Sequence, residues 1–363
     1  MPAITKPNQH FDATTYSGSG GTQSVTNAGS FQPDFVWIKN RTTGYSHLAY
    51  NSIVGAGTAG TNKALQPDTV NAESTVNAGS TYGYLSAFNS NGFTVVQGSD
   101  ATSYTNGSGQ TYVAWNWKAG AAAVTNNDGT ISSQVSANPT AGFSVVTWTG
   151  NGVTAATVGH GLQAIPAMII CKERSGTDYW HVKHKSTGTN TNLFLNTTSA
   201  STSAASVGDG ILGDLSSNTT FGFATAGSPN NVVAVNENGI TNVAYCWSEI
   251  PGYSSFGSYT GNGLADGPFV YCGFRPAFVL IKSTTGNNWT IVDNKRDTSN
   301  VATKRLFPSS AVAEATATNN VDMLSNGFKV RVSEATDAGA NASGVAFIYA
   351  AFAEAPFKYA NAR

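Results

Sequence analysis

The sequence predicts an all-β protein of three tandem antiparallel β-sandwich modules, jelly-roll-like in kind, each an internal repeat of about 105–110 residues. A strand-like stretch occurs three times, at residues 31–39, 164–172 and 274–282, with a Pro and a Lys six positions apart in every copy. Charged residues make up only 11% of the 363 residues, and Gly, Ser, Thr, Asn and Ala fill the difference. This composition is typical of short strands joined by many turns.

The repeated stretch has the pattern of a strand that is buried on both faces. Between Pro276 and Lys282 every residue is apolar, and the other two copies are similar. We expect the Pro at the first position of the strand, where its missing N–H costs no ladder hydrogen bond. We expect the Lys to leave the core at the far end, with its stem over apolar neighbours and its ammonium in water.

Four further elements recur around this stretch in the same order, which extends the repeat to whole modules. An aromatic residue and a Gly-rich turn precede it, at residues 16–20, 148–152 and 259–263. A second alternating strand follows, at residues 45–50, 179–184 and 288–293, with Leu48, Val182 and Ile291 at matched positions. An Asn-Gly-Phe turn or a looser version then enters a strand, at residues 91–96, 220–223 and 326–330. Each module closes on an aromatic-rich strand, at residues 112–117, 242–247 and 347–352.

These repeats divide the chain into module one (residues 1–120), a flexible linker (121–141), module two (142–251) and module three (252–363). The linker is predicted from its Gly-, Ala- and Asn-rich composition. Modules two and three adjoin through residues 250–252, so we expect them to keep a fixed orientation. A short helix is expected near residues 310–317, because this Ala-rich run contains the best helix formers in the chain.

The composition argues against several classes of function. With a net charge of −1 and no basic block, the chain lacks the charge that nucleic-acid binding requires. The three cysteines, Cys171, Cys246 and Cys272, lie in apolar segments without metal-ligand spacing and are expected to be buried and unpaired. No apolar run approaches the ~20 residues of a membrane helix, and residues 1–6 lack the apolar core of a secretory signal. We therefore expect a soluble protein, made in a reducing compartment and without membrane insertion.

His181 and His184 form the strongest candidate metal constellation, but the strand pattern argues against it. Residues three apart on a strand point to opposite faces, so both rings reach one ion only across a bulge. His160 would need a nucleophile on a strained turn for hydrolysis, and no Gly-x-Ser-x-Gly elbow occurs. We predict no metal site, no catalytic residue and no cofactor, and keep zinc binding and hydrolysis as minor hypotheses.

Repeated acids provide another catalytic alternative. Glycoside cleavage needs two carboxylates about 5–9.5 Å apart in a cleft. The repeated acids, Glu73 with Glu314 and Glu249 with Glu354, recur in separate modules, which favours a structural role such as pairing with the repeated Lys or capping a turn. Segment 293–297 lacks the Gly and terminal Glu of a calcium loop and is expected to be a polar turn. An isopeptide crosslink between a repeated Lys and a Glu is the last alternative.

The tryptophans allow a sugar-binding interpretation, because aromatic faces can stack on sugar rings. Most of them, however, occupy matched strand positions, which favours core packing: Trp115, Trp117, Trp148, Trp180, Trp247 and Trp289. The Gly-, Ser-, Thr- and Asn-rich loops differ between modules and are better candidates for contact surfaces. The sequence identifies no individual receptor-binding residue.

The motifs together resemble those of a family of virion structural proteins of tailed bacteriophages, notably marine ones. The resemblance is carried by FQPDFVWIK at 31–39, YVAWNWK at 112–118, GSYTGNG at 257–263, GFRP at 273–276, SNGFK at 325–329 and AFAE at 351–354. It covers nearly the whole chain. Module two departs most, with Ile165 in place of the aromatic residue and Gly222 displaced, so the resemblance gives it the more specialised surface.

The resemblance implies a non-enzymatic virion component, a tail fibre or appendage for host-surface attachment. Other virion proteins and a host-surface glycan are the implied partners, and a homo-oligomer, with a trimer as the expected form, follows by analogy. A capsid decoration or head-fibre protein is the alternative, and a polysaccharide-degrading tail spike is a second one. Because coiled-coil heptads and a long fibre shaft are missing from the sequence, location on head or tail stays open.

Overall fold

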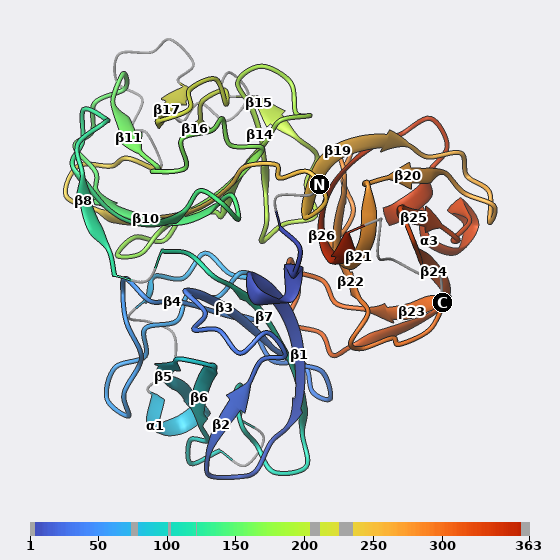
Figure 1. Cartoon of the computed structure of the whole chain (residues 1–363), viewed down its shortest axis with the longest axis horizontal. Helices are drawn as coiled ribbons and strands as arrows, with labels where there is room; N and C mark the ends of the chain where they lie inside the picture. Colours follow the sequence, from blue (N-terminus) through green and yellow to red (C-terminus); the bar gives the residue numbers. More distant parts are fainter. Residues whose placement is uncertain are drawn as a thin grey trace.

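Three β-sandwiches arranged around a common axis make up the protein (Figure 1). This computed structural model describes residues 4–73, 79–100, 103–120, 122–203, 211–224 and 235–356. The strands pair antiparallel within each sheet, and helices are few and short. The prediction of an all-β fold of antiparallel sandwich modules is confirmed.

Module one consists of a four-stranded and a three-stranded sheet packed face to face. The first sheet has the order β1 (Phe11–Ser17), β7 (Thr111–Trp117), β3 (Phe35–Asn40), β4 (Leu48–Asn51). The second has the order β2 (Thr22–Thr26), β6 (Gly92–Val96), β5 (Tyr84–Asn89). A 3-10 turn, η1 (Pro7–Gln9), precedes β1, and a single helical turn, α1 (Gly79–Tyr82), precedes β5.

Module two has a larger first sheet and a small second one. The first has the order β15 (Thr202–Ser203), β14 (Thr191–Phe194), β13 (His181–His184), β12 (Met168–Glu173), β18 (Thr241–Trp247), β10 (Phe143–Thr149), β9 (Ser133–Asn138), β8 (Val124–Asn126). The second has the order β11 (Thr157–Gly159), β17 (Thr220–Ala224), β16 (Ile211–Leu212).

Module three pairs two four-stranded sheets. The first has the order β19 (Ser254–Thr260), β26 (Ala346–Pro356), β21 (Phe274–Ser283), β22 (Thr290–Asp293). The second has the order β20 (Phe269–Tyr271), β25 (Gly327–Val330), β24 (Ala315–Leu324), β23 (Ala302–Arg305). Helix α3 (Glu334–Asn341) lies before β26 and was not predicted from the sequence.

The three copies of the repeated stretch occupy the same place in their sheets. Strands β3, β12 and β21 each lie between the closing strand of the module and the strand that follows in a hairpin. The matched register pairs are Phe35 with Trp117, Met168 with Trp247 and Phe278 with Phe352. All residues of these three strands are buried, as predicted for a strand covered on both faces.

Alternation along the closing strand explains this double burial. On β7, Tyr112 and Ala114 face the sandwich core of module one, whereas Trp115 and Trp117 face the common axis. The axial face merges with its counterparts from modules two and three into one aromatic cluster, which we call the shared core: Phe11, Phe35, Trp117, Phe143, Tyr245, Trp247, Phe278 and Phe352. The modules therefore share one hydrophobic core and are not independent domains.

Residues 121–141 do not form a linker, contrary to the sequence prediction. This segment contains β8 and β9, which pair with each other and extend the first sheet of module two through β10. Val135 on β9 lies opposite Val146 on β10 and is buried in the core of module two. Composition misled the prediction because Ser133–Asn138 is polar on its outer face and presents few apolar residues to the core.

The repeated lysines are fully buried, so the prediction that their ammonium groups reach water is wrong. Lys39 Nζ donates to the backbone oxygens of Asn40 (2.8 Å) and of Ala311 in module three (3.0 Å). Lys172 and Lys282 likewise donate to backbone carbonyls in their own modules. These acceptors replace the water that burial removes. Burial lowers the pKa of each of the three ammonium groups to about 8.

The Ala-rich segment 310–317 is not helical, contrary to the prediction. Strand β24 already begins at Ala315, and the residues before it run along module one. There the backbone N–H of Glu314 donates to the Arg41 carbonyl over 2.9 Å. Tertiary hydrogen bonds of this kind outweigh intrinsic helix propensity, which is a weak preference.

Two details of the repeat also differ from the way in which the sequence analysis matched the three copies. Pro276 is the third residue of β21 and not its first, and it lies at a bulge, where its missing N–H breaks no regular ladder. Ala49, and not Leu48, is the match of Val182 and Ile291, because each lies opposite the residue four positions after the anchor Pro. A one-residue shift of this kind cannot be seen without strand pairing.

A buried asparagine holds the Gly-rich turn of every module, a feature that the sequence analysis missed. Asn341 Oδ1 accepts from the backbone N–H of Asn262 (2.9 Å), and Nδ2 donates to the carbonyls of Leu264 (2.7 Å) and Val332 (2.8 Å). Asn106 and Asn236 bond the matching turns in the same way.

Replacing Asn341 with alanine is expected to lower the free energy of unfolding by about 2 kcal/mol, because buried backbone groups lose their partners. Urea denaturation measures this loss. Asn238→Ala is the control, since Asn238 is exposed in the corresponding region of module two. An Asn341→Ala loss no larger than that of the control would contradict the assignment.

Candidate functional site

The modules close a ring through contacts that recur at each of three seams, named one–two, two–three and three–one. At each seam a ring nitrogen donates to a backbone carbonyl of the preceding module. The pairs are Trp180 Nε1 to Gln66 O (2.9 Å), Trp289 Nε1 to Phe194 O (2.8 Å) and His47 Nε2 to Phe307 O (3.0 Å). The third pair joins module one to module three and so completes the ring.

His47 takes the place of tryptophan at the third seam and uses both ring nitrogens. Trp37 Nε1 donates to His47 Nδ1 over 3.0 Å, so the proton of the neutral ring lies on Nε2, which faces the Phe307 carbonyl. Burial, with the nearby Lys39 ammonium, holds the pKa of His47 well below its usual value. The ring therefore stays neutral and keeps this contact at physiological pH.

Two of the repeated acids lie in these seams. Glu314 of module three accepts two hydrogen bonds from Arg41 of module one, from Nε and Nη2, both 2.9 Å long. Glu73 of module one pairs with Arg174 Nε of module two at 2.7 Å. The partner is an arginine and not the repeated lysine two positions earlier. The recurrence of these acids is explained by contacts between modules.

Replacing Glu314 with glutamine is expected to lower the free energy of unfolding by about 2 kcal/mol, because two charge-assisted hydrogen bonds between largely covered side chains are weakened. Glu249→Gln is the matched control, since its partner Lys185 and Glu249 itself are each about two-fifths exposed, and such a pair contributes about 0–1 kcal/mol. Thermal and urea unfolding compare the two variants. Equal losses would argue against a special role of seam three–one.

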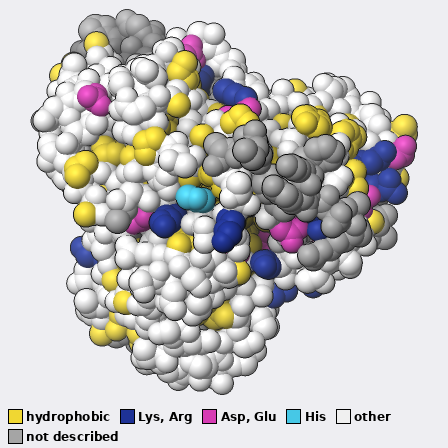
Figure 2. All heavy atoms as spheres, viewed as in Figure 1, with side chains coloured by type: hydrophobic (Ala, Val, Ile, Leu, Met, Phe, Trp, Pro, Cys, Tyr) yellow, Lys and Arg dark blue, Asp and Glu magenta, His cyan; other side chains and the backbone are white. Residues whose placement is uncertain are grey.

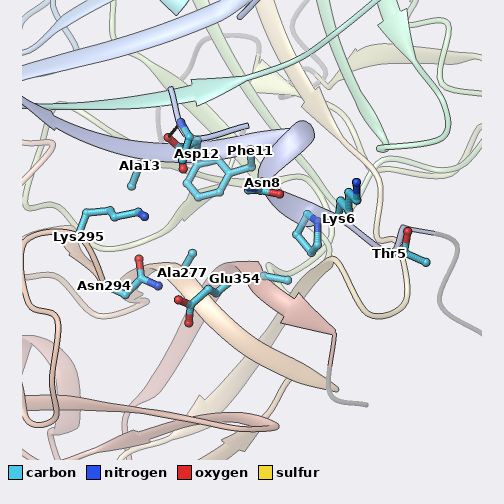
Figure 3. Close-up of a pocket in the computed structure, with 13 residues that line it drawn as sticks. Thr5, Lys6, Asn8, Phe11, Asp12, Ala13, Ala277, Asn294, Lys295 and Glu354 are labelled. Carbon is cyan, nitrogen blue, oxygen red and sulfur yellow. Dashed lines mark hydrogen bonds between the residues drawn. The ribbon is translucent and has the colours of Figure 1, made fainter. Parts of the chain in front are cut away.

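A pocket of about 310 Å³ lies at seam three–one (Figure 3). Module one contributes β1 and the residues before it, including Lys6, Asn8 and Asp12. Module three contributes Ala277 of β21, the turn after β22 and the end of β26. On the face shown in Figure 2, charged side chains are sparse, and several lie near the meeting point of the three lobes.

Two polar side chains of this pocket, Asp12 and Asn294, are almost fully buried. Asp12 of β1 is 5% exposed, and its Oδ2 accepts from Thr14 Oγ1 (2.7 Å) and from the Ala28 N–H (3.0 Å). Burial raises the pKa of Asp12, although these hydrogen bonds act in the opposite direction. Asn294, in the turn after β22, is 6% exposed, and its Oδ1 has no hydrogen-bond partner among the described residues.

The histidines that were weighed as metal ligands or hydrolytic residues do not come together. His181 Nε2 lies 3.1 Å from Asp178 Oδ2, whereas His184 Nε2 donates to the Tyr349 carbonyl (3.1 Å) across seam two–three. His160 Nδ1 accepts from the Leu162 N–H, and burial lowers the pKa of His160 to about 4. In the described part of the chain, no three His, Cys, Asp or Glu side chains form a group that could hold a metal ion.

Segment 293–297 contains the polar turn that the sequence predicted, with Asp293 at its start. Asp293 Oδ1 accepts from the backbone N–H groups of Lys295 (3.1 Å) and Arg296 (2.9 Å). Its Oδ2 accepts from Trp115 Nε1 of module one over 3.0 Å and from Arg296 Nε. This carboxylate is therefore part of seam three–one.

Core packing of the tryptophans is confirmed. Exposure is between 0% and 4% for Trp115, Trp117, Trp148, Trp180, Trp247 and Trp289. The three cysteines are buried and unpaired, as expected. The sequence analysis did not identify Asp12 or Asn294, because it followed residues that recur, and these two do not.

The chain belongs to a family described as domain of unknown function (DUF7483), whose match covers residues 6–356. No curated protein and no solved structure matches the chain. No helix in the described ranges is long and apolar enough to cross a membrane. The family match spans all three modules, so the whole ring, and not one sandwich, is the unit that the family describes.

Proposed function

We propose that the protein is a non-enzymatic structural component of a virion, a tail fibre or appendage that contacts the host surface. The bacteriophage resemblance of the sequence motifs motivates this proposal. The fused ring supports it, because a rigid body with a shared core suits a part that must hold its shape during attachment. Other virion proteins and a host glycan are the partners we propose.

The observation that carries the proposal is that the modules are alike inside and different outside. On β20, Phe269 and Tyr271 are 46% and 64% exposed on an edge strand of module three. The matched positions hold small residues in the other modules: Ser24 and Thr26, and Thr157 and Gly159. Variation on the outer surface of a repeated scaffold is typical of contact surfaces.

Immunogold labelling of purified virions tests the proposal directly. We expect label on the tail, and we expect the purified protein to compete with virions for adsorption to host cells. Phe269→Ala/Tyr271→Ala is expected to weaken this competition, whereas Ser24→Ala/Thr26→Ala serves as the matched control. A protein that is absent from purified virions would overturn the proposal.

Capsid decoration is a second candidate, and the threefold arrangement within one chain favours it. A single copy presents three similar lobes and so matches a threefold-symmetric site on a shell. Label on the head, with no effect on adsorption, would support this alternative. A polysaccharide-degrading spike would be supported by new reducing ends after incubation with host polysaccharide. Assembly into a homo-oligomer, with a trimer as the expected form, is checked by sedimentation.

A further inference from the structure

The pocket at seam three–one lies where the ring has no covalent bridge. The chain runs from β7 of module one into β8 of module two, and from β18 of module two into β19 of module three, so the chain itself crosses these two seams. At the third seam η1 packs beside β26 instead. Figure 3 shows the resulting space, with Lys295 and Asn294 on one side, Glu354 beside them and Asp12 of β1 across from them.

Several residues that line the pocket differ from the residues at the matched positions of the other two modules. In Asp12 and Lys295 the pocket has charged side chains where the other modules have uncharged ones. Strand register matches Asp12 with Ser144 and Ser255, and Lys295 with Ile53 and Ser186. At seam two–three, the residues that match Asn294 and Glu354 form the Lys185–Glu249 ion pair with each other. Seam three–one alone thus combines a buried acid, an unpaired amide oxygen and an exposed lysine, among the residues described.

The side chains of the pocket offer both hydrogen-bond acceptors and a hydrogen-bond donor. Asn294 Oδ1 is a buried acceptor without a donor among the described residues, and of the buried amide oxygens in that state it is the one that lines this pocket. The Asp12 carboxylate, which accepts from Thr14 and Ala28, and the Glu354 carboxylate, which pairs with Arg275 Nη1 at 3.0 Å, have further acceptor capacity, and Lys295 is a donor. The methyl groups of Ala13, Ala28, Ala277 and Ala353 form the apolar part of the lining.

We propose that this pocket binds one sugar unit of a glycan, an inference that rests on the proposed attachment function. Sugar hydroxyls donate to Asn294 Oδ1 and to the carboxylates, and they accept from the Lys295 ammonium. The alanine methyls contact the C–H groups of the sugar ring. At about 310 Å³ the pocket has the size of a small-molecule site, and such sites combine apolar walls with a few placed polar groups.

Binding of free monosaccharides to the full chain tests the proposal, by saturation-transfer NMR and by calorimetry. Glucose, galactose, N-acetylglucosamine and rhamnose are the probes. We expect at least one to bind, with affinity reduced about tenfold in Asn294→Ala and in Lys295→Ala. Lys185→Ala is the matched control, because Lys185 occupies the position of Asn294 in module two, and it should bind as the wild type does. Lys295 is exposed, so Lys295→Ala should keep the wild-type melting temperature.

Three outcomes would overturn the pocket assignment: no probe binds at millimolar concentration, binding persists unchanged in both variants, or Tyr271→Ala abolishes binding while the pocket variants do not. The last outcome would move the sugar site to β20. The results that would reject the proposed virion function are different from these. A chain that binds sugar through Asn294 yet is absent from virions rejects the virion proposal alone. A virion protein without sugar binding rejects the pocket alone.

Discussion

Replacing Trp117 with alanine should lower the free energy of unfolding by about 4 kcal/mol, within the ~3–5 kcal/mol typical of buried aromatic truncations. The Trp117 ring packs against Phe35 of its own module (5.3 Å between centroids), Trp247 of module two (5.8 Å) and Phe352 of module three (5.5 Å). The cavity therefore weakens all three modules at once. Calorimetry should show one unfolding transition for the wild type and one, at lower temperature, for the variant.

Trp148→Ala is the matched control for this substitution. Trp148 is equally buried but packs within module two, against Phe221 and Phe223. Native-state hydrogen exchange should show lost protection in all three modules for Trp117→Ala and mainly in module two for Trp148→Ala. If Trp117→Ala lowers protection in module one alone, the modules are energetically independent and the shared core does not couple them.

Raising the pH above 10 should unfold the protein steeply. Burial raises the pKa of six tyrosines of the described ranges, to about 12 for Tyr112 and Tyr349; the others are Tyr16, Tyr50, Tyr245 and Tyr253. Above pH 10 the unfolded chain loses these protons while the folded chain keeps them. The stabilisation is thus complete below the unfolded pKa and falls as pH rises, by about 1.4 kcal/mol per pH unit for each tyrosine.

The buried lysines act in the opposite direction at lower pH. Because their folded pKa is about 8, the folded chain releases these protons before the unfolded chain does, which raises stability above pH 8. Urea denaturation across this pH range should therefore show a gain before the steep loss. Tyr253→Phe is the informative variant: the Tyr253 hydroxyl has no partner in the described structure, so the change should cost little at pH 7 and reduce the alkaline loss. An unchanged alkaline slope in this variant would contradict the mechanism.

The modules could be predicted from the sequence because strand interiors impose strict spacing. Pro33 and Lys39, and their matches, keep the same separation since both faces of the strand are buried in every copy. The ring could not be predicted in the same way, because its contacts recur only in part, with one seam departing from each pattern. His47 takes the place of tryptophan at one seam. At seam two–three the described residues form no Glu–Arg pair, and the Ser201 N–H donates to the Thr284 carbonyl.

The candidate pocket could hardly be predicted from the sequence. Asp12 is a single acid in an otherwise unremarkable strand, and its meaning depends on the strand register that matches it with Ser144 and Ser255. The unpaired state of Asn294 depends on packing between modules, which no local pattern encodes. In a repeat protein, residues that depart from the repeat mark the specialised surface, and finding them requires the exact register.

The unbridged seam gives the molecule a defined mechanical weak point. A pulling force applied between η1 and the end of β26 acts across seam three–one, since the two segments are neighbours there. In a string of separate domains every domain bears the full tension, and they extend one after another. Here module two, which lies outside the loaded seam, stays shielded from tension until the Arg41–Glu314 and His47–Phe307 contacts break and the ring opens.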